Sequence, residues 1–198
     1  MNRASRNTIR YYDEHAAEYA RKSASFEMAS LYRPFLELIP DGGRILDAGC
    51  GSGRDTRAFM DRGYDVVAFD GSKEMTQQAE RLIGEPVQQC LFQEMRFENE
   101  FDGVWCCAAL LHVPRVEIVG ILDRFIRALH DNGVCYVSFN EGDGERINKD
   151  RHFTDLAVHD LTDLISATGQ AEVIHTWQSE DYRFSRNVSW VNALFRKS

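Results

Sequence analysis

The stretch Asp47-Ala-Gly-Cys-Gly-Ser-Gly53 decides the expected fold, because it places a glycine-rich turn between a short apolar strand and a helix. We expect the strand over residues 44–47 and the helix over residues 53–62. Glycine suits such a turn because its backbone adopts unusual dihedral angles and lets a ligand approach closely. In an open parallel sheet, ligands bind at the carboxyl ends of the strands, so the turn is a candidate binding site.

The spacing of the loop and the next acidic residue narrow the kind of ligand. The G-x-G-x-G spacing differs from the G-x-G-x-x-G of dinucleotide-binding folds, which wraps a pyrophosphate onto a helix N-terminus. Asp47, which opens the loop, suits a cationic group better than a diphosphate. Asp70 ends the next expected strand, over residues 65–70, and is followed by Gly71. It is either a solvated turn residue or an acceptor for both hydroxyls of a ribose, and its place relative to the loop favours the ribose.

Expected strands and helices alternate along the chain as far as residue 139. This alternation predicts a parallel sheet that helices cover on both faces. Ser72 is expected to cap the helix that follows Asp70. The further strands are expected over 86–90, 101–108 and 134–139, and the further helices over 72–83 and from Pro114 to a break at Asn132-Gly133.

The two ends of the chain complete this core. Two N-terminal helices are expected over 8–22 and 26–39, and the stop Pro40-Asp-Gly-Gly43 follows them. After residue 139 we expect a polar loop over 140–152, a helix over 158–168, and strands over 172–178 and 188–195 that pair as a hairpin. The predicted fold is therefore α/β: a three-layer, doubly wound (Rossmann-like), seven-stranded, mostly parallel sheet with a C-terminal antiparallel hairpin.

Composition limits the class of protein. The chain has 198 residues, of which 43% are hydrophobic and 27% charged, which is typical of one globular domain. The net charge of −8 argues against a long phosphate-tracking surface. The apolar run Val104–Leu111 is too short to cross a bilayer, which takes about 20 residues. The five cysteines form no C-x-x-C pair, so we expect buried thiols in a reducing, cytoplasmic compartment and no metal site.

The glycine loop, with Asp70 after the next strand, resembles motifs I and II of the class I S-adenosylmethionine-dependent methyltransferases. Phe101-Asp-Gly-Val-Trp105 is similar to the fourth strand of that family, and Leu129-His-Asp-Asn-Gly133 to the turn before its fifth strand, without the usual proline. The segment from Tyr12 to Tyr19 resembles the lid helix of members that act on small molecules. The chain looks most like small bacterial methyltransferases of the tellurite-resistance and biotin-pathway type.

The resemblance implies S-adenosylmethionine as cofactor, a lid over residues 1–40 and a binding core over 41–198. Gly49 and Gly51 would pack against the methionine and ribose parts, while Asp70 would hold the ribose. The acidic residue that often meets the adenine amine is missing, and Leu91-Phe92 stands in its place, so Gln93, Glu94 or backbone groups would serve there. Arg54 would pair with the methionine carboxylate, or it is a solvated helix residue. The implied cofactor-binding set is Tyr12, Tyr19, Asp47, Gly49, Gly51, Arg54, Asp70, Gly71, Phe92 and Cys107.

Methyl transfer is a displacement in which the enzyme mainly brings nucleophile and methyl group together in a dry pocket. A general base helps only if the acceptor must lose a proton. His112, just past the fourth strand, is the candidate base, or its ring bonds a local backbone carbonyl. The loop 140–146 either gates the pocket or is solvated, and Trp190 and Asn192 either line the acceptor side or belong to the core.

Three other functions remain open at this stage. A nicotinamide-dependent oxidoreductase would need the dinucleotide glycine spacing, which is not found. A non-catalytic S-adenosylmethionine-binding protein would need the same loop and Asp70. A tRNA or other nucleic-acid methyltransferase is disfavoured by the net charge of −8. The expected partner is a small-molecule acceptor, with neither nucleic acid nor membrane, for a monomer or homodimer.

Overall fold

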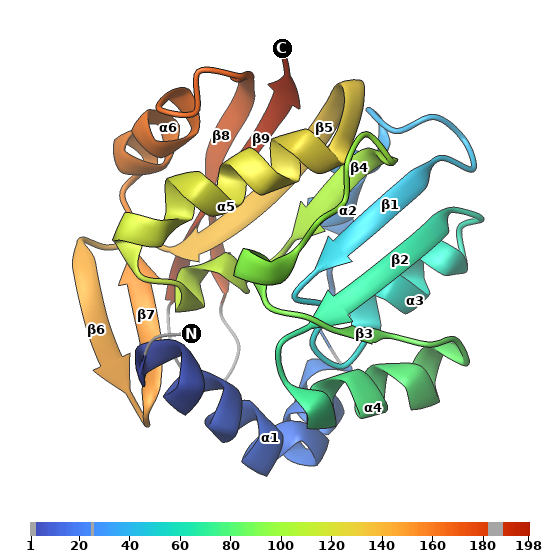
Figure 1. The fold of residues 1–198 in the computed structure, drawn as a ribbon, viewed down its shortest axis with the longest axis vertical. Coiled ribbons are helices and arrows are strands. Elements are labelled where there is room, and N and C mark those ends of the chain that lie inside the picture. Colours follow the sequence, from blue (N-terminus) through green and yellow to red (C-terminus); the bar gives the residue numbers. More distant parts are fainter. Residues whose placement is uncertain (1–2, 25, 182–187) are drawn as a thin grey trace.

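The computed structural model describes residues 3–24, 26–181 and 188–198. In these ranges, seven strands form one sheet in the order β3-β2-β1-β4-β5-β9-β8 (Figure 1). Strand β9 runs antiparallel to both β5 and β8, whereas the pairs from β3 to β5 are parallel. The strands are β1 (Arg44–Ala48), β2 (Asp65–Asp70), β3 (Gln88–Gln89), β4 (Phe101–Cys106), β5 (Leu129–Asn140), β8 (Ala171–Asp181) and β9 (Val188–Lys197). The predicted α/β fold, including its antiparallel C-terminal hairpin, is confirmed.

Helices cover both faces of the sheet because the central strands are apolar on both sides. Ile45 and Leu46 are neighbours in β1, point to opposite faces and are both fully buried. On one face, Leu46 belongs to the core that α5 (Arg115–Ala128) and α6 (Val158–Ser166) complete. On the other, Ile45 and Trp105 pack with α2 (Ala29–Leu36) and α3 (Arg54–Met60).

Helix α4 (Lys73–Ile83) packs Ala79 and Ile83 against Ala68 of β2. The predicted cap of this helix is confirmed, since Ser72 Oγ accepts a hydrogen bond from the Met75 N–H at 3.2 Å. The cap therefore sets the direction in which the chain leaves the carboxyl end of β2.

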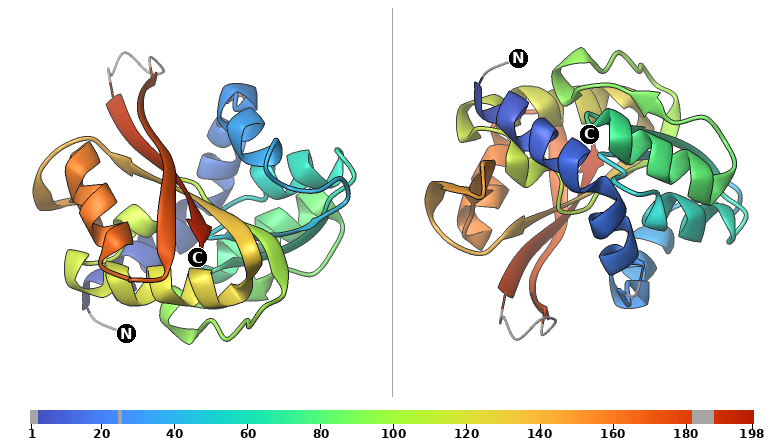
Figure 2. Two further views of the ribbon diagram at one scale, coloured as in Figure 1. Left: turned by 90° about the horizontal axis from the view of Figure 1, so that it is seen from above. Right: turned by 90° about the horizontal axis from the view of Figure 1, so that it is seen from below.

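Helix α1 (Arg3–Ser23) lies across the carboxyl ends of the parallel strands (Figures 1 and 2). Polar contacts along its length hold it there. The N–H of His152 donates to Thr8 Oγ1 at 3.0 Å, and Ser72 Oγ donates to Asp13 Oδ1 at 2.6 Å. Near the end of the helix, the hydroxyls of Ser23 and Ser52 lie 3.0 Å apart. The helix thus covers the edge of the sheet at which a ligand is expected.

The prediction of a polar loop over residues 140–152 is wrong. The structure has a two-stranded antiparallel sheet there, formed by β6 (Gly144–Asn148) and β7 (Arg151–Asp155). The turn residues Lys149 and Asp150 have φ of +51° and +65°. Turns of this kind are usually signalled by Asn-Gly or Asp-Gly, and a Lys-Asp pair carries no such signal. The guanidinium of Arg146 also bonds the Asp155 carboxylate, which ties the two strands together.

Several boundaries also differ from the expectation. Helix α2 covers only 29–36 of the expected 26–39, because residues 37–39 continue as turns with bonds such as that from Leu38 N–H to Phe35 O at 3.1 Å. Strand β3 covers only Gln88–Gln89 of the expected 86–90. Helix α5 ends at Ala128 and β5 begins at once, so Asn132, with φ of +64°, lies in an irregular part of the strand.

None of the helices in the described ranges combines the length and apolar character that crossing a bilayer requires.

Gly103 of β4 gives a test of the contact between the sheet and the segment that contains α2. A Cβ there would lie 2.5 Å from Ile39 Cδ1 and 2.7 Å from Phe35 Cζ. We expect Gly103→Ala to lower the free energy of unfolding in urea by about 1–3 kcal/mol, because the tight packing must open. The matched control is Gly120→Ala in α5, where a Cβ meets nothing within 4 Å and should stabilise by about 0.5–1 kcal/mol. Wild-type stability of Gly103→Ala would contradict this packing.

Candidate functional site

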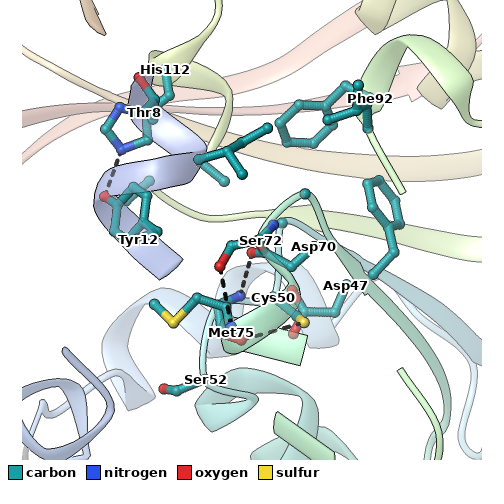
Figure 3. Close-up of a pocket in the computed structure, with 18 of the residues that line it drawn as sticks. Thr8, Tyr12, Asp47, Cys50, Ser52, Asp70, Ser72, Met75, Phe92 and His112 are labelled. Carbon is teal, nitrogen blue, oxygen red and sulfur yellow. Dashed lines mark hydrogen bonds between the residues drawn. The ribbon is translucent and has the colours of Figure 1, made fainter. Parts of the chain in front are cut away.

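A pocket lies at the carboxyl ends of β1, β2 and β4, beneath α1 (Figure 3). The residues that line it come from α1, the glycine loop, the end of β2, the segment after β3 and the segment after β4. The structure therefore brings together segments that are up to about a hundred residues apart. All eleven predicted site residues line this pocket: Tyr12, Tyr19, Asp47, Gly49, Gly51, Arg54, Asp70, Gly71, Phe92, Cys107 and His112.

The glycine loop forms the floor of the pocket, and its backbone demands glycine. Gly49 has φ of +78°, and a Cβ on it would lie 2.5 Å from the Ala109 Cβ and 3.1 Å from Phe92 Cζ. Gly51 has φ of +57°. The N–H groups of Gly49 and Cys50 both donate to the Phe69 carbonyl of β2, at 2.9 and 3.0 Å. The loop is thus pinned to β2 and packs so closely against Ala109 and Phe92 that no side chain fits at Gly49.

Asp70 connects the loop to the start of α4. Its Oδ2 accepts from the Gly51 N–H at 2.9 Å, and its Oδ1 accepts from the Ser72 N–H at 2.8 Å. Burial raises the pKa of the Asp70 carboxyl, although these backbone hydrogen bonds oppose the rise. Asp70 is therefore partly structural, and each oxygen still has lone-pair capacity for a ligand hydroxyl.

Asp47 lies deeper than the sequence suggested. It is 2% exposed, and its Oδ2 accepts from Thr56 Oγ1 at 2.6 Å. Burial, together with the negative charge of Asp55, raises the pKa of the Asp47 carboxyl. A buried carboxylate with so few donors gains from a nearby positive charge, so Asp47 favours a cationic group in the pocket.

Arg54 is neither solvated nor unpaired. Its Nε and Nη2 donate to the two oxygens of Asp55 at 2.6 and 2.9 Å, and its side chain is 22% exposed. Among the described residues that line the pocket, Arg54 is the only arginine or lysine. Any anionic group of a ligand therefore meets this guanidinium first.

Tyr12 and His112 join α1 to the segment after β4 (Figure 3). His112 Nδ1 lies 2.7 Å from the backbone carbonyl of His152 in β7, and its Nε2 lies 2.7 Å from the Tyr12 hydroxyl. Because a carbonyl can only accept, Nδ1 carries the proton and Nε2 accepts from Tyr12. The bond to a backbone carbonyl weighed for His112 from the sequence is therefore present, but its other nitrogen faces the pocket.

Phe92 closes the end of the pocket nearest β3. Its ring meets Phe69 and Phe125 edge-on, with centroids 5.7 and 5.9 Å apart. Gln93 lines the pocket and donates from Nε2 to Glu117 at 2.7 Å. Glu94 is not among the lining residues of the described chain and instead accepts from the Leu91 N–H. Of the two side chains considered for the adenine amine, only Gln93 is in place.

Other residues weighed from the sequence lie elsewhere. Within the described ranges, neither Trp190, Asn192 nor any residue of 140–146 lines the pocket. Asn192 is 1% exposed and bonds Tyr136, Trp177 and Ser179 inside the sheet. Sequence reasoning also missed that Thr8 and Ser23 on α1 line the pocket. In the sequence they look like ordinary polar residues of a helix, and only the fold places α1 across the ends of the strands.

Part of the chain is similar to known methyltransferases. Residues 45–133 match a family model described as a methyltransferase domain. YqeM of Bacillus subtilis, provisionally named a methyltransferase, is 31% identical over 104 residues, which are 48% of this chain and 42% of that protein. A ubiquinone biosynthesis O-methyltransferase of Psychrobacter arcticus is 31% identical over 106 residues, 49% of this chain and 40% of its own length. The chain thus spans less than half the length of these two relatives.

A solved structure shows the same fold. The 1,6-didemethyltoxoflavin-N1-methyltransferase of Burkholderia thailandensis, crystallised with 1,6-didemethyltoxoflavin and S-adenosylhomocysteine, superposes with a TM-score of 0.76. The match covers 100% of this chain and 91% of that chain at 22% identity. Over residues 45–133, the family match agrees with the predicted class, a methyltransferase. Residues 45–133 of this chain therefore match a methyltransferase domain, and they lie in a fold shared with a solved methyltransferase.

Proposed function

We propose that the whole chain is an S-adenosylmethionine-dependent methyltransferase that acts on a small-molecule acceptor at O, N or S. The observation that carries this proposal is the convergence of the glycine loop, Asp70, Arg54 and His112 on one pocket at the carboxyl ends of the parallel strands. When bound there, S-adenosylmethionine supplies an activated methyl group on a sulfonium. The chain's own residues bind and orient the two reactants and exclude water.

The shape and polarity of the pocket fit this cofactor. The backbone at Gly49 and Gly51 has positive φ, and an added Cβ at Gly51 would come no closer than 3.8 Å to a neighbouring atom, so a ligand can approach the loop there. Asp70 would hold ribose hydroxyls, and Phe92 with Gly71 would flank the adenine. Arg54 would meet the methionine carboxylate, and buried Asp47 would favour the positive sulfonium over a neutral thioether. Cys107 lies at this end as a neutral thiol, because burial and the charge of Asp55 raise its pKa to about 12.

His112 is proposed as the base for an acceptor that must lose a proton. Its Nδ1–H is held by the His152 carbonyl, so the Nε2 lone pair is directed toward the pocket and Tyr12. Burial, opposed by that backbone bond and helped by nearby Arg151, lowers the pKa of His112 to about 3. The ring is therefore neutral at physiological pH. It acts as a base only if the Tyr12 hydroxyl leaves Nε2 and the bound reactants raise this low pKa.

Enclosure by α1 favours a small acceptor over a nucleic acid. The helix lies across the pocket and is bonded at Thr8, Asp13 and Ser23, so residues 1–40 are proposed as a lid on the core at 41–198. The names of the 1,6-didemethyltoxoflavin-N1-methyltransferase and the ubiquinone biosynthesis O-methyltransferase also refer to small acceptors. The resemblance to the tellurite-resistance and biotin-pathway type stays a prediction.

Cofactor binding is tested with S-adenosylhomocysteine by isothermal titration calorimetry. We expect Asp70→Asn to weaken binding about tenfold or more, because the variant loses charge-assisted bonds to the ribose and the loop. Asp65→Asn is the matched control: it changes the same residue type at the exposed start of the same strand and should leave affinity unchanged. Equal affinity of Asp70→Asn and wild type would remove Asp70 from the site.

Methyl transfer is tested with trideuteromethyl S-adenosylmethionine, using the small-molecule fraction of a bacterial extract and, separately, purified tRNA. Mass spectrometry should find the label in a small molecule and not in RNA. Label in tRNA would favour the nucleic-acid function, and no label in either fraction would favour a non-catalytic binding protein. His112→Ala should slow labelling of an acceptor that loses a proton, because the base is removed. Near-normal turnover would exclude His112 from the mechanism.

The buried, neutral ring of His112 also makes stability depend on pH. The pKa of His112 is about 3 in the folded chain and 6.5 in an ordinary setting, so between these values the unfolded chain binds the extra proton. This contribution is fully present above pH 6.5 and is lost as the pH falls toward 3. Urea unfolding of wild type and His112→Gln should therefore show a steeper loss of stability for wild type below pH 6.5. Parallel pH profiles would show that the ring is not held neutral.

A further inference from the structure

Asp55 is a buried carboxylate in the first turn of α3 that accepts four hydrogen bonds. Its Oδ1 accepts from the Tyr32 hydroxyl at 2.5 Å and from Arg54 Nε at 2.6 Å. Its Oδ2 accepts from Arg54 Nη2 and Trp105 Nε1, both at 2.9 Å. Its side chain is 8% exposed. Both oxygens are thus saturated by donors from α2, α3 and β4, which leaves the carboxylate no capacity to bind a ligand itself.

The four donors keep Asp55 ionised despite its burial. Burial raises the pKa of the Asp55 carboxyl, but the Arg54 guanidinium and the bonds from Tyr32 and Trp105 outweigh burial and hold this pKa below its usual value. A buried charge of this kind persists only where its partners are in place. The arrangement is therefore a rigid anionic anchor under the glycine loop.

The anchor determines the direction of the Arg54 side chain. The guanidinium is planar, so fixing Nε and Nη2 on the two oxygens of Asp55 also fixes where the remaining nitrogen, Nη1, points. Arg54 lines the pocket beside Ser52, Tyr19 and Cys107, while the other charged side chains of the lining are the carboxylates of Asp47, Asp55 and Asp70. An anionic ligand group in this acidic pocket depends on Arg54 alone for a cation.

We propose that Asp55 is a positioning residue that holds Arg54 to receive the α-carboxylate of the cofactor's amino-acid end. This inference rests on the proposed function and deepens it. Tyr32 and Trp105 hold Asp55 in turn, so the core under α2 preorganises the recognition of that carboxylate. A positive charge alone does not suffice for tight binding of the carboxylate. A flexible cation in place of the held Arg54 guanidinium would lose conformational freedom when the ligand binds, and this loss weakens affinity.

The test compares two ligands by calorimetry on the full chain. S-adenosylhomocysteine carries the amino-acid end, whereas 5′-methylthioadenosine has the same nucleoside and thioether sulfur without it. The ratio of the two affinities therefore reports recognition of the amino-acid end. We expect Asp55→Asn and Arg54→Met to weaken S-adenosylhomocysteine about tenfold or more and to leave 5′-methylthioadenosine within about twofold.

Arg54→Lys separates orientation from charge. Lysine keeps the positive charge but cannot bond both Asp55 oxygens and still present a fixed donor. Positioning by Asp55 predicts that Arg54→Lys loses most of the preference for S-adenosylhomocysteine. This variant also keeps a cation beside Asp55, so it remains informative if Asp55→Asn fails to fold. A retained preference in Arg54→Lys would overturn the proposal.

Tyr32→Phe is a milder variant, since it removes one of the four bonds to Asp55 and leaves both bonds from Arg54 in place. It should lower the melting temperature and reduce the affinity ratio less than Asp55→Asn does. If Asp55→Asn weakens both ligands equally, Asp55 is only structural and the inference is wrong. If Arg54→Met leaves the ratio unchanged while 5′-methylthioadenosine still binds, the inference fails and the cofactor pocket stands. Binding of neither ligand to wild type would overturn the proposed function as well.

Discussion

The backbone of the glycine loop is the constraint on which the rest of the site depends. A Cβ added to Gly49 would lie only 2.5 Å from the Cβ of Ala109. The φ of Gly49, +78°, is also one that other residues rarely adopt. The loop therefore passes directly under the segment after β4, while its N–H groups bond the end of β2 and Asp70. Three parallel strands are locked together at one point, and the pocket opens above it.

The pocket is acidic and closed from above by polar contacts. Asp47 is buried in it and Asp70 is partly buried, and among the described residues neither forms an ion pair, whereas Asp55 pairs with Arg54. Buried carboxylates are costly unless something compensates them. A positively charged ligand supplies that compensation, and α1 supplies the exclusion of water that strengthens it. The same enclosure accounts for the neutral ring of His112, whose two nitrogens are both bonded.

Much of the fold followed from local patterns that are strong in this chain. The strand over 65–70 and the Ser72 cap appear as expected, because a continuous apolar run and a capping hydroxyl act over a few neighbours. The hairpin of β6 and β7 did not, because its strands are polar and its turn is Lys149-Asp150 with positive φ. That hairpin contributes the carbonyl of His152, so the setting of His112 could not be foreseen either.

The sequence by itself determined the parallel sheet and the glycine loop, since topology sends the carboxyl ends of parallel strands to one edge. Its resemblance to a known family indicated ten of the eleven residues that line the pocket, and the position of His112 after the fourth strand indicated the other. Tertiary structure alone decided what each side chain does there. Arg54 is held by a carboxylate that Tyr32 and Trp105 also bond, and His112 is joined to Tyr12 a hundred residues away. Such bonds depend on distances between elements that are far apart in the chain, and no local pattern records them.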